Sequence, residues 1–370
     1  MTTPRQKDET PAAGAQLGLL GQREILRLAW TRREQALASG FFPRGSDEDT
    51  RLARTGVAHQ VEARREEALG LRVPVGDVEP RVGGGREDEV RGAHAAYDTR
   101  GTPVMLALAD AHCHLDANYF PEGADAVLAR ATAAGVVGFV VVGVGADLTQ
   151  ACSALELARR RPDRVAACVG IHPHDAVSWS EAAHDELRVL AGQAEVVAVG
   201  EIGLDYHYDH SPREVQRDVF ARLIGLAREL GKPIVVHTRE AAEDTLAILE
   251  REGARDVGGI IHCFSEDRPF ATRALDLGFD VSLSGIVTFK SAVAVQEVAA
   301  WVPLDRILVE TDSPYLAPVP LRGKKCEPAN VIYTARRVAE LRGIPVEELA
   351  MATLANTERR FGKRFAREGV

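Results

Sequence analysis

Histidine and acidic side chains follow several short β-branched runs of this sequence, and their types and spacing suit metal binding. They are His112, His114, Glu201, His237, His262 and Asp312. Imidazoles and carboxylates are common ligands of divalent metal ions. Because successive side chains of a strand point to opposite faces, His112 and His114 point one way while Cys113 points the other, so the two imidazoles can share one ion. Such a set at the ends of separate strands is typical of a two-metal hydrolase.

From Leu106 onward, short apolar runs alternate with amphipathic segments, which is the rhythm of βα units around a parallel sheet. We expect strands near 106–109, 136–142, 165–169, 196–199, 234–237, 259–262, 279–283 and 306–310. We expect helices near 122–134, 148–160, 182–191, 213–230, 240–252, 267–277, 292–300, 329–342 and 346–360. This alternation favours a (β/α)8 TIM barrel, in which active sites lie at the C-terminal ends of the strands. Every candidate ligand falls there.

A doubly wound open sheet is the alternative fold. Its sites cluster at one switch point, and its dinucleotide-binding members carry a Gly-rich turn after the first strand. Here the first strand runs into His-Cys-His, which favours the barrel. The segment 279–283 fits a strand or the entry to a loop equally well.

Composition and charge are those of an ordinary enzyme, with 370 residues, 45% hydrophobic, 27% charged and a formal net charge of −9. No apolar run approaches the roughly 18 residues that span a bilayer, and no secretory apolar core follows Met1. We therefore expect a cytoplasmic protein with no membrane partner, and we favour a monomer. The acidic balance argues against nonspecific nucleic-acid binding, but bound cations can still hold phosphates.

The cysteines are odd in number and form no C-x-x-C pair, which argues against a disulfide framework and a thiolate zinc site. They are Cys113, Cys152, Cys168, Cys263 and Cys326. We expect them to be reduced and mostly buried.

Six motifs occur in order along the chain: Asp110–Asp116 (DAHCHLD), Gly170–Pro173 (GIHP), Gly200–Asp205 (GEIGLD), Val236–Arg239 (VHTR), Ile261–Ser265 (IHCFS) and Glu310–Pro314 (ETDSP). Together they resemble the signatures of the TatD-type metal-dependent deoxyribonucleases, which are amidohydrolase-like barrels. The resemblance covers about residues 107–362. Arg322–Pro328 also resembles the basic segment of that family, with Cys326 where the family usually has Asn.

The resemblance implies a divalent-metal-dependent hydrolase, and a 3′-5′ exonuclease or deoxyribonuclease that cleaves phosphodiester bonds of single-stranded DNA or RNA. Phosphate contacts borne on loops and a metal pair at the mouth suit a chain end better than an intact duplex. Related barrels are implicated in removing D-amino acids from tRNA, so ester hydrolysis of D-aminoacyl-tRNA on the same metal centre is one alternative. A noncatalytic metal-binding protein is another, and it predicts a closed coordination shell.

Two divalent ions about 3.5–4 Å apart help phosphodiester hydrolysis by clamping oxygens and acidifying a bound water, and such a pair needs a bridging carboxylate. Glu201 resembles the family's bridging Glu, and Gly200 and Gly203 beside it permit a close approach of backbone and metal. Asp312 would ligate one ion and take the proton of the attacking water.

His112 and His114 would hold the first ion, and His237 and His262 the second. Imidazole ligands favour zinc or manganese. Magnesium stays open because the resemblance admits it.

Substrate contacts are less sharply indicated. The resemblance gives His172 a contact with substrate phosphate, although a His before Pro173 can simply cap a loop. Arg239 either steadies a phosphate or pairs with Glu240 or Glu243.

Arg322 and Lys324 lie just beyond the eighth strand, where they either contact phosphate or form a solvated turn. The remaining histidines of this region are expected to be solvated: His174, His184, His207 and His210.

The first 104 residues contain no catalytic constellation. We expect residues 1–104 to be a disordered extension or a misassigned start, because Met105 stands where the resembling family begins. The hydrolase domain would then span residues 105–363.

Overall fold

The structure is a computed structural model that describes residues 96–97, 103–104 and 106–367, and its centre is a sheet of parallel strands. The strands are β3 (Leu108–Cys113), β4 (Val136–Val144), β5 (Val165–Gly170), β6 (Val196–Asp205), β7 (Ile234–Arg239), β8 (Gly259–Ile261), β9 (Phe279–Leu283) and β10 (Ile307–Val309). Each pairs with the next in sequence order. A bridge between Cys113 and Ser313 joins the last strand region to the first, so the predicted (β/α)8 barrel is confirmed.

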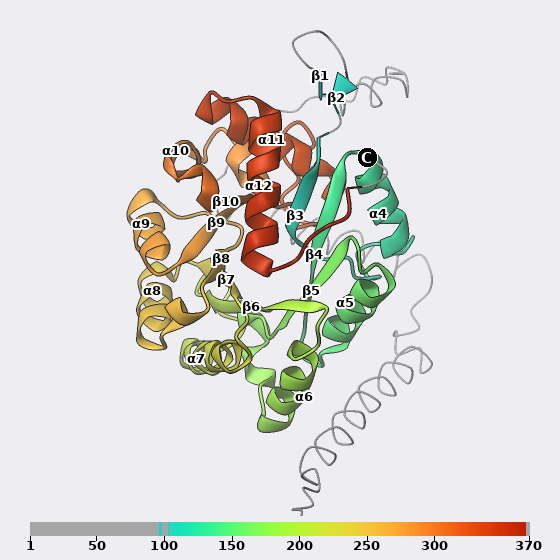
Figure 1. Ribbon diagram of the computed structural model, residues 1–370. Coiled ribbons are helices and arrows are strands. Elements are labelled where there is room, and N and C mark those ends of the chain that lie inside the picture. Colours follow the sequence, from blue (N-terminus) through green and yellow to red (C-terminus); the bar gives the residue numbers. More distant parts are fainter. Residues whose placement is uncertain (1–95, 98–102, 105, 368–370) are drawn as a thin grey trace, which may run out of the picture.

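Helices surround the ring of strands in sequence order (Figure 1). They are α4 (Ala124–Ala133), α5 (Thr149–Arg160), α6 (Glu181–Ala191), α7 (Arg213–Leu230), α8 (Ala242–Arg251), α9 (Arg268–Asp276), α10 (Val293–Trp301), α11 (Val331–Arg342) and α12 (Val346–Phe361). All were predicted to within two residues at each end. Among these described helices, none is long and apolar enough to cross a membrane.

The structure describes two short strands before the barrel, β1 (Ala96–Tyr97) and β2 (Pro103–Val104), which pair in antiparallel fashion. The rest of residues 1–104, and Met105 itself, lie outside the described residues. The expectations for that segment therefore stay predictions.

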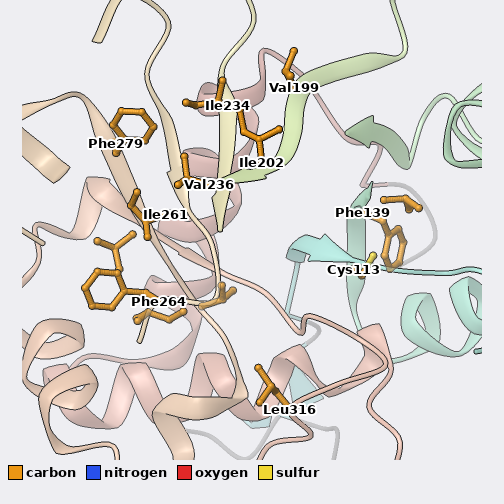
Figure 2. Close-up of a cluster of buried hydrophobic side chains, with 14 of the residues drawn as sticks. Cys113, Phe139, Val199, Ile202, Ile234, Val236, Ile261, Phe264, Phe279 and Leu316 are labelled. Carbon is orange, nitrogen blue, oxygen red and sulfur yellow. The ribbon is translucent and has the colours of Figure 1, made fainter. Parts of the chain in front are cut away.

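Two layers of apolar side chains pack on the two faces of the strands. Ile234 and Val236 of β7 belong to the large cluster between the sheet and the helices, whereas Val235 belongs to the smaller cluster inside the barrel. Figure 2 shows Ile202 of β6 beside the side chains of β7 in the large cluster. The next inward positions of β7 are His237 and Arg239, so period-two alternation directs them into the mouth.

The end of the barrel opposite the ligands is filled by the C-terminal segment. Leu354 and Phe361 of α12 and Phe365 after it pack into the inner cluster. A Cβ atom at Gly138 would lie 2.4 Å from the Phe365 ring, so only glycine leaves room for it. This end is filled by packed side chains, whereas the predicted ligands lie at the other end.

Two strands carry irregular register near predicted ligands. In the β6–β7 pair, Gly200 is opposite Val235 but Ile202 is opposite Val236, so the extra residue Glu201 forms a bulge. A similar shift in β3 lies between Asp110 and Cys113. Glu201 was expected directly after the fourth strand; it lies inside β6, and the bulge is what turns it into the barrel.

The cysteines match the expectation. None of the five forms a disulfide bond among the described residues; Cys113, Cys168 and Cys326 are buried, and Cys152 and Cys263 are half-buried.

Candidate metal centre

The six predicted ligands converge at the C-terminal ends of the strands. His112, Glu201, His262 and Asp312 are each at most 3% exposed. The set therefore forms one buried polar group.

The first group joins two strands across the closing seam of the barrel. The Nε2 atoms of His112 and His114 lie 3.2 Å apart, and Asp312 Oδ1 lies 3.7 and 3.6 Å from them. Asp312 adopts a left-handed backbone conformation, with φ of 54°, that Asp tolerates better than most residues. Its amide donates to the carbonyl of His112 at 3.0 Å, so the seam itself aligns the three side chains.

Glu201 presents its two oxygens to two different sets of imidazoles. Oε2 lies 3.4 Å from His112 Nε2 and 3.7 Å from His114 Nε2. Oε1 lies 2.8 Å from His237 Nδ1 and 2.6 Å from His262 Nε2. The carboxylate thus stands between the two predicted ligand pairs.

His172, which sequence analysis had not placed among the ligands, joins the second set of imidazoles around Glu201. Its Nε2 lies 3.3 Å from Glu201 Oε1, and it groups with Glu201 and His237 at metal-ligand spacing. However, its Nδ1 accepts the backbone N–H of His174 at 3.1 Å. Burial lowers the pKa of His172 to about 3, so the ring is neutral and its one proton sits on Nε2. In this state His172 is a hydrogen-bond donor.

Two carboxylates outside the predicted ligand set hold the histidines of the second group. Asp205 Oδ2 lies 3.0 Å from His237 Nε2, and Glu310 Oε1 lies 3.4 Å from His262 Nδ1. Glu310 also accepts the backbone N–H of Cys263 at 2.6 Å. Such outer carboxylates orient the ring and favour the tautomer that presents its other nitrogen to a metal. Both lie in the quoted motifs, but neither spacing nor residue type indicated which histidine each would contact.

Asp110 is a further acid that sequence analysis did not single out. It is fully buried and accepts two hydrogen bonds from Thr311, from the backbone N–H at 2.9 Å and from the hydroxyl at 2.6 Å. Burial raises the pKa of Asp110 to about 8. Its contacts fasten the start of the His112 segment to the Asp312 segment across the seam.

Without metal, protons neutralise part of the centre. Burial opposes charge on Glu201, but His262 and His172 outweigh it and hold the pKa of Glu201 well below its usual range. Burial likewise opposes charge on His262, but Glu201 raises its pKa to about 10. A cation that replaces this proton would interact with the same carboxylate, which is the expected coupling of metal binding to proton release.

The glycines beside Glu201 lie close to the backbone of β7. A Cβ at Gly203 would lie 1.9 Å from the carbonyl oxygen of His237, and one at Gly200 would lie 2.6 Å from Val235 Cβ. These glycines let β6 approach β7. Their small size serves strand packing, and the expected close approach of a metal stays a prediction.

A cavity of about 480 Å³ opens above the ligands and is lined by His114, Glu201 and Asp312. His172 and Arg239 also line it. Arg239 lies over the ring of Tyr208 at 4.8 Å, while Glu240 bonds His207 and Glu243 bonds Arg273.

The predicted solvated histidines divide into two kinds. His174 is half-buried in the cavity lining, so that expectation is wrong for it, whereas His210 lines the cavity but is exposed, as expected. His174 Nε2 lies 3.0 Å from Asp205 Oδ2. Loop residues of this kind carry no periodic signal that would place them in advance.

Arg322 and Lys324 do not line the cavity. The Arg322 guanidinium lies 4.5 Å from the centre of the Phe289 ring, and Lys324 is exposed. Lys325, one residue on, bonds the carbonyl of Tyr119 at 3.0 Å, and Tyr119 does line the cavity. Three tyrosines of this lining, Tyr119, Tyr208 and Tyr315, were absent from the predicted site.

The donor set fits divalent cations. His112, His114 and Asp312 bring three donor atoms within 4.8 Å of one another, and Asp312 Oδ1 lies too far from either imidazole for a strong hydrogen bond. They are buried, so bulk water does not balance their charge. Imidazole and carboxylate donors suit zinc and manganese well and admit magnesium.

Comparison with known proteins agrees with this geometry. The family model described as TatD related DNase matches residues 109–362. The chain is 46% identical over 259 residues to an uncharacterized metal-dependent hydrolase, YcfH, of Escherichia coli (strain K12), a match that covers 69% of this chain and 96% of that protein.

Two further similarities bear on the site. Over 258 residues the chain is 34% identical to the 3′-5′ ssDNA/RNA exonuclease TatD of Pantoea ananatis (strain LMG 20103), covering 68% of this chain and 98% of that one. The crystal structure of YJJV, a TatD homolog from Escherichia coli K12, matches with a TM-score of 0.65 and 30% identity, covering 69% of this chain and 98% of the other.

Proposed function

Because this chain belongs to the TatD-related deoxyribonuclease family and is a metal-dependent hydrolase of that type, we propose that it is a 3′-5′ exonuclease that cleaves phosphodiester bonds of single-stranded DNA or RNA. The observation that carries the proposal is the position of Glu201, whose two oxygens face two sets of histidines beneath an open cavity. One relative bears the name of such an exonuclease.

In this proposal His112, His114 and Asp312 would hold one ion, His237 and His262 would hold a second, and Glu201 would serve both. The ions would be zinc, manganese or magnesium. Divalent ions held there supply charge neutralisation for a phosphodiester and lower the pKa of water.

The chain's own residues then divide the remaining work. Asp312 lines the cavity and faces the seam histidines, which supports a role as the general base that accepts the proton of the attacking water. His172 donates from Nε2, which suits a phosphate oxygen better than a metal. Arg239, held over Tyr208, adds a fixed positive charge for the same phosphate.

Two alternatives remain as outcomes of one experiment. A noncatalytic metal site would be closed, whereas this one opens into a cavity lined by four of its predicted ligands. Ester hydrolysis of D-aminoacyl-tRNA would use the same residues.

The test incubates the metal-loaded protein with single-stranded DNA and RNA labelled at the 5′ end, and in parallel with D-aminoacyl-tRNA. We expect 5′-mononucleotides to be released from the 3′ end, activity to disappear with a chelator, and manganese, magnesium or zinc to restore it. Full turnover in metal-free protein would refute the mechanism. Deacylation without nucleotide release would replace the exonuclease with the deacylase.

A further inference from the structure

Aromatic side chains stand at both ends of the cavity that covers the metal centre. At the seam, Tyr119 from the loop after β3 and Tyr315 from the loop after β10 meet edge to face, with ring centres 5.7 Å apart. The Tyr315 hydroxyl donates to the Tyr119 oxygen at 2.7 Å. We call these two residues the seam pair.

The second pair comes from the loop after β6. The rings of Tyr208 and His210 are stacked, with centres 5.4 Å apart and planes 5° apart. Arg239 lies over the Tyr208 ring, and the His174 ring meets its edge. His210 is exposed, so this stack is open on its outer side. We call Tyr208 and His210 the loop pair.

The strand order places the metal centre between the two pairs. Around the mouth, the loops after β10 and β3 are followed by those after β4, β5 and β6. The seam pair therefore begins the arc that lines the cavity and the loop pair lies near its other end. Glu201 and His114 line the same cavity between them.

One unsatisfied polar atom supports a ligand at the loop pair. The Tyr208 hydroxyl is buried and has no hydrogen-bond partner among the described residues. Buried hydroxyls are rarely left without a partner, so a ligand that contacts this wall would remove a cost that the protein alone carries.

A phosphodiester joins two nucleosides, so a strand with its scissile phosphate over Glu201 must place one base on each side of it. Aromatic rings bind bases of any sequence by stacking, because every base has a π-face. We propose that the seam pair and the loop pair each stack on one of the two bases that flank the scissile phosphate, so that the cavity recognises a dinucleotide unit. This inference rests on the proposed exonuclease function and adds the form of the substrate that is bound.

The experiment removes bases and rings separately. Single-stranded oligonucleotides labelled at the 5′ end carry an abasic residue at the 3′-terminal position, at the penultimate position, or at neither. The variants are His210→Ala and Tyr315→Leu, and kcat/KM is measured for each protein with each strand. His207→Ala is the matched control, because His207 lies in the same loop as His210 but does not line the cavity.

We expect each abasic position to lower kcat/KM of the wild-type protein by roughly 5- to 150-fold, the range for one lost base stack. Each variant should lose a similar factor on the complete strand. The loss caused by His210→Ala should disappear on one of the two abasic strands only. The loss caused by Tyr315→Leu should disappear on the other abasic strand only. Tyr315→Phe, which keeps the ring, and the control His207→Ala should retain the wild-type dependence on bases.

Two results separate failure of the inference from failure of the exonuclease proposal. Hydrolysis at equal kcat/KM for complete and abasic strands would overturn the stacking and leave the exonuclease intact. If no strand is cleaved, the exonuclease proposal fails. Fluorescence anisotropy then measures the affinity of the metal-loaded protein for the same strands. Tighter binding of the complete strand than of the abasic strands, lost in both variants, would support the stacking. Equal affinities for complete and abasic strands would overturn it.

Discussion

Asp280 and Glu201 are both buried carboxylates of the same barrel, but their neighbours differ in a way that separates structure from chemistry. Asp280 lies at the start of β9, away from the mouth, and is paired with Arg306, with Arg359 at 3.3 Å and with Arg360 at 2.8 Å. Its neighbours are guanidinium groups, which stay charged at any physiological pH. The chain itself supplies the positive charge that this carboxylate needs.

Around Glu201 the balance is reversed. Its neighbours are imidazoles, which are charged only when protonated, and further buried acids surround them: Asp205, Glu310 and Asp312. Arg239 is the one buried permanent cation that the described cavity lining contains. The comparison teaches that the Asp280 cluster is complete within the chain, whereas the mouth is arranged for cations that come from outside.

Removal of the bridging charge should give the largest effect. Glu201→Gln places a neutral amide between the two proposed cation sites, which it would bridge poorly. We expect metal content per chain to fall, and kcat to fall by more than the roughly 10²–10⁴-fold loss typical of a missing general base. Metal analysis beside kcat checks this, and full metal content in this variant would contradict the bridging role.

Asp312→Asn should come next. The amide keeps the shape and one acceptor oxygen but loses the basicity, while the four histidines and Glu201 remain. We expect metal to be retained and kcat to fall about 10²–10⁴-fold. If kcat stays near normal with normal metal content, the base is another acid at the mouth, and Asp205 is the next candidate.

Asp280→Ala tests the cluster that Asp280 forms with its three arginines. It leaves three arginines without their buried anion, and we expect the free energy of unfolding to fall by about 3–5 kcal/mol. Urea denaturation measures this. Asp125→Ala, which removes a partner of exposed arginines, is the control and should cost about 1 kcal/mol or less. Metal content of folded Asp280→Ala should be unchanged; a loss would show that the two clusters are not independent.

The outer carboxylate Asp205 should have a smaller effect on metal. Asp205→Asn weakens the hold on His237, and we expect metal affinity to fall about 10- to 100-fold. Competition with a fluorescent chelator measures this. Asp209→Asn serves as control, because Asp209 is exposed and bonds Arg213 in the same loop. Equal affinities in the two variants would remove Asp205 from the centre.

The smallest effect is expected at Lys324. It is exposed and does not line the cavity, so Lys324→Ala should change KM for a single-stranded substrate by no more than about twofold. A tenfold rise in KM would restore the sequence-based prediction that this segment contacts phosphate.

The barrel could be predicted because its signals are local. A strand is marked by a short β-branched run and a helix by an apolar face. Both patterns lie within a few neighbouring residues, so they can be recognised without knowledge of the rest of the chain. Even the ambiguous segment 279–283 is the strand β9. The bulge at Glu201 could not be seen, because a register shift belongs to two strands rather than one.

The sequence alone determined the residue types, their order and their places at strand ends. These are enough to identify the family, the barrel and the set of six candidate ligands. Tertiary structure decided the contacts between distant segments: Asp110 with Thr311, 201 positions apart, and Tyr119 with Tyr315, 196 apart. It also decided that His172 accepts a backbone N–H and so keeps its proton toward Glu201. The physical reason is that charge balance, tautomers and stacking depend on which atoms lie within a few ångströms of each other, and only the closed barrel brings those atoms together.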